Sequence, residues 1–444
     1  MRMTPGWLTI ARLALIQTSI GAVVVLTTST LNRVMVVELA LPATLPSLLI
    51  AVYYAVQLTR PRFGHGSDVG MRRTPWIVGG VALLAVGGVA AAAATGLLEH
   101  HRLPGLALGI MAFAAIGAGA GAAGTALLTL TASIVSPAAR GPAATAMFTM
   151  MIAGFALTTA AASRLLDPFS TLRLVAVTAM VGALAWLVAL LAAWRLEDTF
   201  PEARADGAPS PFRQALAVVW GESGTRRFAL FVFASMLGYS GQDVVLEPFG
   251  GLAFGLTLAE TTHLSAWQNG GIFCGMVLTA IAGGLLGRRY PGTLRVTAIA
   301  GAVLSALCLS LLSVGPYVGM TGETIFPLAA VLGIGLGTFT ISAIGAMMAM
   351  ANAGADGRAG LRMGVWGAAQ ALAFGLGGLV AGICVDLVAL ATGRMVVGYG
   401  VVFAGQALLF ALAAVQARKA IRLTGATATS AFRASRSRIG QRQT

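Results

Sequence analysis

Two short clusters of charged residues interrupt otherwise apolar stretches of the chain, and their types could support proton transfer or charge pairing. Asp243 and Glu247 are four residues apart, so on a helix both carboxylates would lie on one face. Carboxylates this close repel each other unless one is protonated or a cation lies between them. Arg33 and Glu38 form the other cluster. We therefore treat these four residues, with Gln242, as candidates for a gate or a coupling site.

The composition excludes a soluble enzyme as the class of protein. The 444 residues are 57% hydrophobic and only 10% charged, with a mean hydropathy of +0.85, whereas a soluble domain carries about 25% charged residues. The net charge of +14 comes from basic residues in short clusters between apolar runs, not from one patch. We therefore expect no nucleic-acid partner.

Long apolar runs indicate an integral membrane protein, because a spanning helix requires about 20 apolar residues. Twelve such runs lie at about 13–35, 44–60, 75–97, 105–134, 143–165, 174–194, 228–254, 264–286, 295–314, 324–351, 363–386 and 396–417. A cytoplasmic N-terminus places most basic residues inside and leaves only Arg33, Arg102, Arg164, Arg173 and Arg394 outside. This predicts twelve transmembrane helices with both termini cytoplasmic, in a bacterial inner or intracytoplasmic membrane among its lipids.

A more polar stretch divides the chain into four predicted parts. Residues 1–196 form a six-helix half, 197–227 a cytoplasmic linker, and 228–417 a second six-helix half. The tail at 418–444 is basic and poor in apolar residues, so we expect it to be disordered in the cytoplasm.

The two halves share a sequence pattern. Gly117, Gly119 and Gly121 recur 216 residues later as Gly333, Gly335 and Gly337, and Arg72-Arg73 recur as Arg288-Arg289 at the same offset. A constant offset predicts two parallel six-helix repeats, which is typical of the major facilitator fold.

The stretch 64–73 resembles the major facilitator loop signature G-x-x-x-D-x-x-G-R-R. Gly64, Asp68, Arg72 and Arg73 match it, whereas Met71 replaces its second glycine. The resemblance implies a charge pairing between helices that holds one conformation, and a carboxylate near a helix N-terminus and arginines is physically suited to that role. The alternative is a plain turn with the usual cytoplasmic arginines.

The repeat also suggests a partner for Arg33. The first and seventh spans are repeat mates that would face each other, so we hypothesise that Arg33 pairs with Asp243 or Glu247. The alternative is that all three side chains reach the outer membrane surface independently.

Three motifs resemble the PucC family, the bacteriochlorophyll-delivery branch of the major facilitator superfamily. They are L-N-R-V-M-V-V-E-L at 31–39, S-D-V-G-M-R-R-T-P-W-I at 67–77 and Q-D-V-V-L-E-P-F-G-G at 242–251. The resemblance implies assembly of light-harvesting antenna complexes, with delivery of bacteriochlorophyll to antenna polypeptides. Implied partners are those polypeptides, reaction-centre assembly intermediates or bacteriochlorophyll-synthesis enzymes.

A bound pigment would require a flat slot and an axial ligand for its magnesium. The glycines at 117–124 and 333–337 could form slots, although close helix packing is the commoner use of such residues. His263, with Gln268 nearby, is the best candidate ligand. We predict no covalent cofactor, no other metal site and no catalytic residue, and bacteriochlorophyll only as cargo.

Two other functions remain open. One is a major facilitator secondary transporter of a small apolar molecule, with Asp243 and Glu247 as proton-coupling groups. The other is an enzyme such as a prenyl or pigment transferase, which the sequence disfavours because it has no Asp-rich motif for a diphosphate-bound metal.

Overall fold

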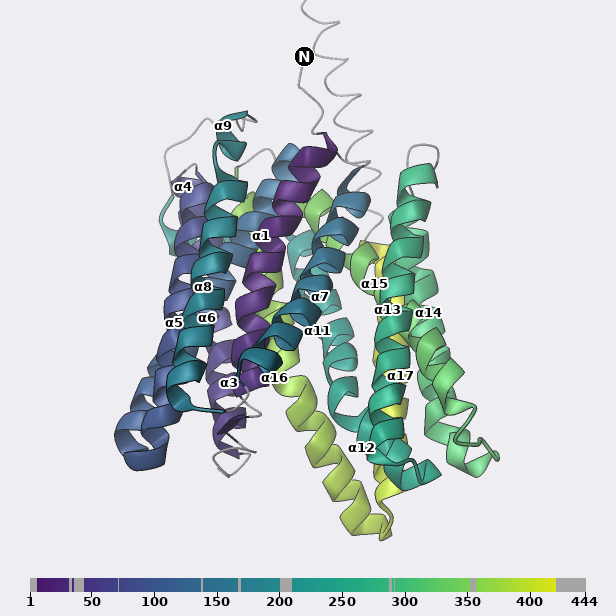
Figure 1. The fold of residues 1–444 in the computed structure, drawn as a ribbon. Helices are drawn as coiled ribbons and strands as arrows, with labels where there is room; N and C mark the ends of the chain where they lie inside the picture. The colour runs from purple at the N-terminus through teal and green to yellow at the C-terminus, as the bar shows by residue number, and fades with distance from the viewer. Residues whose placement is uncertain are drawn as a thin grey trace, which may run out of the picture. The chain divides into compact units, whose positions relative to one another are not determined.

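The regular structure of the described residues is entirely helical (Figure 1). The computed structural model describes residues 6–31, 34–35, 44–70, 72–136, 139–166, 169–199, 210–286, 290, 292–351 and 357–420. The first helices are α1 (Trp7–Val25), the π-helix η1 (Leu26–Thr30), α3 (Thr44–Gln57), α4 (Arg60–Val69), α5 (Thr74–His100), α6 (Arg102–Ile134), α7 (Arg140–Leu165), α8 (Thr171–Ala193), α9 (Leu196–Thr199) and α10 (Phe212–Gly221). The others are α11 (Ser223–Ser240), α12 (Gln242–Phe254), α13 (Leu258–Leu286), α14 (Thr293–Val314), the 3-10 helix η4 (Gly315–Tyr317), α15 (Ile325–Ala351), α16 (Ala359–Thr392) and α17 (Met395–Ala420).

The helices coincide with the apolar runs of the sequence. Among the described residues, nine helices are long and apolar enough to cross a membrane, or ten if α11 and α12, which meet at a 41° bend, form one span. The two other predicted runs coincide with α3, of 14 residues, and α13, of 29. The count of twelve spans and the cytoplasmic termini stay predictions.

The chain forms two compact units that do not follow the sequence order strictly. Unit 1 comprises residues 1–136, 146–219 and 356–375, and unit 2 comprises 137–145, 220–355 and 376–444. Unit 1 therefore includes the first part of α16, and unit 2 includes the start of α7. The stretch predicted as a linker, 197–227, holds most of α9, all of α10 and the start of α11, and α10 buries Ala215 and Val219.

The same packing scheme occurs in both units. In unit 1, α5 packs against α6 and α8, α3 against α6, and α1 against α8. In unit 2, α14 packs against α15 and α17, α13 against α15, and α11 against α17. These sets of helices lie side by side within each unit (Figure 1). The repeated scheme is the structural counterpart of the glycine pattern in the sequence.

Glycines at equivalent positions bring the paired helices together. A Cβ on Gly80 of α5 would lie 2.9 Å from the carbonyl oxygen of Gly119 in α6. In unit 2, a Cβ on Gly301 of α14 would lie 2.7 Å from the carbonyl oxygen of Gly335 in α15. Both distances are too short for a real Cβ contact, so the close approach of each helix pair requires glycine.

Three glycines of the rows considered as pigment slots lie directly against the backbone of other helices. A Cβ on Gly117 would lie 2.5 Å from the carbonyl oxygen of Tyr53, and one on Gly333 would overlap the carbonyl oxygen of Gln268. Gly337 lies in the same way against Ile272. The slot interpretation is therefore wrong for these glycines, which serve helix packing instead.

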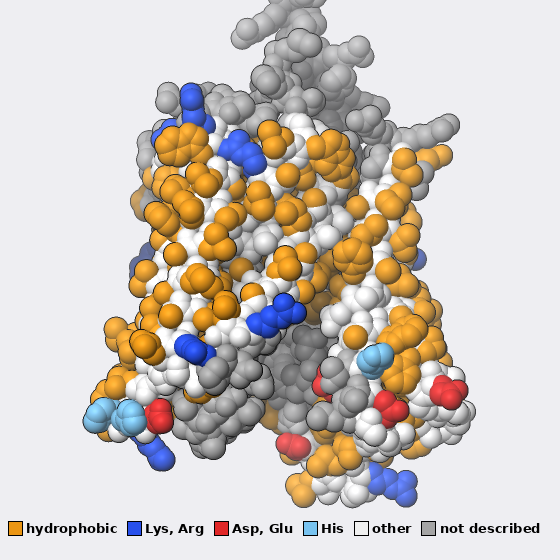
Figure 2. All heavy atoms as spheres, in the orientation of Figure 1, with side chains coloured by type: hydrophobic (Ala, Val, Ile, Leu, Met, Phe, Trp, Pro, Cys, Tyr) orange, Lys and Arg blue, Asp and Glu red, His pale blue; other side chains and the backbone are white. Residues whose placement is uncertain are grey.

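Hydrophobic side chains cover most of the visible helix surface (Figure 2). Acidic and histidine side chains gather near helix ends at the bottom of that view. An apolar surface of this extent is expected where helices face lipid, since lipid carries no hydrogen-bonding groups for polar side chains.

Candidate functional site

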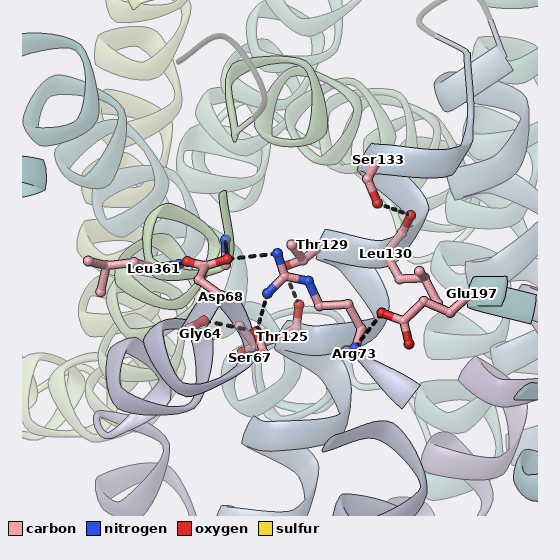
Figure 3. Close-up of polar contacts among 11 residues, drawn as sticks. Gly64, Ser67, Asp68, Arg73, Thr125, Thr129, Leu130, Ser133, Glu197 and Leu361 are labelled. Carbon is pink, nitrogen blue, oxygen red and sulfur yellow. Dashed lines mark hydrogen bonds and ion pairs between the residues drawn. The ribbon is translucent and has the colours of Figure 1, made fainter. Parts of the chain in front are cut away.

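The carboxylate of Asp68 lies at the N-terminus of α16, far from it in sequence. Its Oδ1 accepts a hydrogen bond from the backbone N–H of Gly360 at 2.9 Å, and its Oδ2 accepts one from Leu361 at 2.8 Å. The first amides of a helix have no partner within the helix, and the helix dipole favours negative charge there. Asp68, at the end of α4, thus caps α16 within unit 1 (Figure 3).

Arg73 holds this carboxylate from the other side. Its Nη2 lies 2.7 Å from Asp68 Oδ1, and its Nη1 donates to Ser67 Oγ at 2.7 Å. Ser67 Oγ in turn donates to the carbonyl oxygen of Gly64 at 2.8 Å. The side chains of Arg73 and Asp68 are only 4% and 6% exposed, so the ion pair is shielded from water and salt.

Burial and charge pairing act in opposite directions on Asp68. Burial raises the pKa of this carboxyl, while Arg73 and the two amides of α16 lower it. Burial has the larger effect. The ionised form therefore depends on Arg73 and α16 to offset its lost hydration.

A second carboxylate, Glu197 of α9, caps the N-terminus of α5. It accepts hydrogen bonds from the backbone N–H of Arg73 at 2.5 Å and of Thr74 at 3.0 Å, and from the Thr74 hydroxyl at 2.8 Å. Arg73 thus contacts Glu197 through its backbone and Asp68 through its side chain (Figure 3). The sequence placed Glu197 at the edge of a linker, and no motif marked it.

The first glycine of the loop signature also has a structural reason. A Cβ on Gly64 would overlap the carbonyl oxygen of Gly360 at the start of α16. The matching requirement holds for Gly360, whose Cβ would lie 2.5 Å from the Gly64 carbonyl oxygen. Gly64, Asp68 and Arg73 are thus brought together, whereas the Arg72 side chain is exposed.

The polar candidates of the seventh span lie against α13 in unit 2. Gln242 of α12 is buried, and its Oε1 accepts a hydrogen bond from Gln268 Nε2 at 3.1 Å. One turn further along, half-buried Glu247 accepts a hydrogen bond from Ser265 Oγ at 2.5 Å. Two polar contacts therefore join α12 to α13.

Other candidate residues are not brought together. His263 is exposed near the start of α13, whereas Gln268 is buried, so the two face different surroundings and do not form one ligand pair. Arg33, Glu38 and the side chain of Asp243 lie outside the described residues. Among the described residues, no group of three His, Cys, Asp or Glu could hold a metal ion.

These features define a class: a multi-pass membrane protein in which a carboxylate of the major facilitator loop signature caps a distant helix. The fold agrees with solved structures. A bacterial homologue of the iron transporter ferroportin in its outward-facing state aligns with a TM-score of 0.73 at 13% identity, covering 93% of this chain and 98% of the homologue. The proton:xylose symporter XylE aligns with a TM-score of 0.66 at 15% identity, covering 92% and 93%. The predicted all-helical major facilitator fold is therefore confirmed.

The chain belongs to the PUCC protein family, whose profile matches residues 30–424. It is 44% identical to the "Bacteriochlorophyll synthase 44.5 kDa chain" of Rhodobacter capsulatus over 96% of this chain and 98% of the relative. It is 31% identical to "Protein PucC" of the same organism over 90% of both chains. The family resemblance read from the three motifs is confirmed.

Proposed function

We propose that this chain is an assembly factor for light-harvesting complexes, which binds bacteriochlorophyll or delivers it to antenna polypeptides. The observation that carries this proposal is the 44% identity, over 96% of the chain, to a relative named for bacteriochlorophyll synthesis. The relatives named PucC come from Rhodobacter capsulatus, Cereibacter sphaeroides and Rhodovulum sulfidophilum. The family context supports a role in photosynthesis, and we propose the inner or intracytoplasmic membrane as its location.

The proposed role does not require catalysis by this chain. In this proposal pigment is handled by an apolar membrane protein that changes conformation, and the major facilitator fold is compatible with that role. In this view the Asp68–Arg73 pair at α16 holds one conformation, as the loop signature implies. The name of the Rhodobacter capsulatus relative would then describe a chain that assists a synthase and is not itself the catalyst. The proposed partners of the present chain are antenna polypeptides, reaction-centre assembly intermediates or bacteriochlorophyll-synthesis enzymes.

The test is a near-infrared absorption spectrum of the protein after affinity purification from a pigment-producing phototrophic host. Stoichiometric bacteriochlorophyll that survives gel filtration, absent from a tagged unrelated membrane protein, supports pigment binding. A colourless protein that still retains antenna subunits supports a scaffold role within assembly. A protein with neither pigment nor antenna subunits overturns the proposal.

Proton-coupled transport of a small apolar molecule is the second candidate, favoured by the carboxylate of Glu247. This half-buried group accepts a hydrogen bond from Ser265 of α13, and a carboxylate among apolar helices usually has a function. Bacteriochlorophyll added to proteoliposomes on a supported membrane should then drive a proton current. The Glu247→Gln variant should show no such current.

A further inference from the structure

Arg60, at the start of α4, has its guanidinium between α6 and the first part of α16, all within unit 1. Its Nη1 donates to the carbonyl oxygen of Gly367 at 3.2 Å. Its Nε is buried and has no hydrogen-bond partner among the described residues. The guanidinium is thus bonded through Nη1, while the Nε donor on its other edge has no described acceptor.

The charge of Arg60 also has no counter-ion in the part of the chain that the structure describes. Among the described residues, no carboxylate lies within ion-pair distance of its guanidinium. Arg73, thirteen residues later, shows the contrasting arrangement, because its buried charge is paired with Asp68. Arg60 itself is half-buried, so its guanidinium keeps some contact with solvent, whereas its buried Nε has lost hydration that no described group replaces.

Glycines on two helices leave room for the Arg60 side chain. A Cβ on Gly367 of α16 would lie 2.8 Å from Nη1 and 2.9 Å from Cδ of Arg60. On the α6 side, a Cβ on Gly121 would lie 3.3 Å from Arg60 Cγ, and one on Gly124 would lie 3.7 Å from Nη2. Two helices therefore lack side chains where the arginine lies, so its position depends on these glycines.

An aromatic wall adjoins the same place. Tyr53 and Tyr54 lie near the end of α3 within electrostatic range of Arg60; Tyr53 is buried and Tyr54 is half-buried. Their rings are 4.9 Å apart in an edge-on arrangement, and Tyr54 also stacks on Phe374 of α16 at 6.2 Å and 14°. A ligand at Arg60 would thus meet a charged group at one end and aromatic surface beside it.

We propose that Arg60 binds the anionic group, a carboxylate or a phosphate, of a membrane amphiphile whose apolar body packs along the half-buried rings of Tyr54 and Phe374. Arginine pairs with both groups through two parallel N–H donors, and the Nε–Nη2 edge offers that geometry. The site is separate from the Asp68–Arg73 pair and from the polar contacts of α12 and α13. It does not depend on the assembly role, because bacteriochlorophyll carries no free carboxylate.

The test compares two probes that differ by one charge. The protein is placed in phosphatidylcholine nanodiscs and titrated with pheophorbide a, a chlorin with a free carboxylate, or with its methyl ester. Fluorescence gives the two Kd values. The native protein should bind the acid at least tenfold more tightly than the ester, and Arg60→Gln should bind both alike.

Two variants make the result specific to the guanidinium. Arg62→Gln removes the same charge from an exposed residue two positions away, and it should keep the native preference. Gly367→Ala keeps every charge but displaces the Arg60 side chain, so it should reduce the preference even if Arg60→Gln fails to fold. The proposal is overturned if the native protein binds acid and ester equally and phosphatidylglycerol does not raise its Tm. It is also overturned by a preference that persists in both Arg60→Gln and Gly367→Ala.

A lipid phosphate is the other source of the anionic group. Replacing part of the phosphatidylcholine by phosphatidylglycerol should then raise the Tm of the native protein and of Arg62→Gln, but not that of Arg60→Gln. This outcome assigns the site to a lipid headgroup, whereas preference for the acid assigns it to a carboxylate amphiphile. Absence of both effects rejects the site and leaves the spectrum of the purified protein as a separate test of the assembly role.

Discussion

Asp68 and Arg73 form an ion pair with 2.7 Å between Oδ1 and Nη2, and the same carboxylate accepts two backbone amides of α16. One carboxylate is therefore shared between a cation five residues away and a helix terminus that follows about 290 residues later in the chain. The arrangement joins α4, α5 and α16 within unit 1. The first two predictions concern this junction.

Replacing Asp68 by Asn should destabilise the protein by about 3–5 kcal/mol, because it leaves the buried guanidinium of Arg73 unpaired. Chemical unfolding in detergent followed by circular dichroism measures this loss. Arg72→Gln, at an exposed position of the same loop, is the control and should change stability little. The double variant Asp68→Asn, Arg73→Gln should lose less than the sum of the two single losses, and strict additivity would contradict the pairing.

Gly64→Ala should lower stability by about 1–3 kcal/mol, because the added methyl group overlaps the backbone of Gly360. The two helices would have to move apart, which also lengthens the bonds of Asp68 to α16. Gly79→Ala in α5 is the matched control, since nothing lies within 4 Å of its added Cβ. Its helix propensity should make that variant neutral or more stable. Equal losses in both variants would refute the close-approach explanation.

Glu197→Gln should weaken the cap on α5 and reduce stability by about 0.5–2 kcal/mol. Gln retains one acceptor oxygen but loses the charge that favours a helix N-terminus, where Arg73 and Thr74 donate. Hydrogen exchange should rise in the first turn of α5 and not at its end. Glu99→Gln, exposed near the end of α5, should leave that exchange unchanged.

Exposed Glu260, near the start of α13, should make local stability depend on acid pH. Hydrogen bonds from the backbone N–H and the hydroxyl of Thr257, both 2.8 Å, lower the pKa of this carboxyl. The contribution of Glu260 to local stability is therefore complete above the carboxyl pKa of the unfolded chain, about 4.3. It is lost as the pH falls through the lower pKa of the folded protein. The protection factor of the Thr257 amide, which relates its exchange rate to the intrinsic rate at each pH, should fall on acidification over that range. In Glu260→Gln the amide should exchange without this pH step.

Local patterns in the sequence determined the class of the protein and the positions of its helices. The run predicted at 75–97 is α5, Thr74–His100, and the run at 295–314 is α14, Thr293–Val314. Such agreement has a physical basis: in lipid every backbone amide must be satisfied within its own segment, so an apolar run of that length folds as a helix by itself. The glycine offset of 216 residues likewise indicated a repeat, which the matching helix contacts display.

Tertiary structure alone decided the partners of the polar residues. The loop motif marked Asp68 and Arg73, but the acceptor of that carboxylate is a helix end almost 300 residues away, and nothing in the motif names it. Glu197 and Arg60 carried no sequence signal, although one is paired and the other lacks a described counter-ion. Whether a charge is capped, paired or left unpaired depends on which segments pack around it. Contacts between distant segments, unlike helix formation, are not encoded by the neighbouring residues.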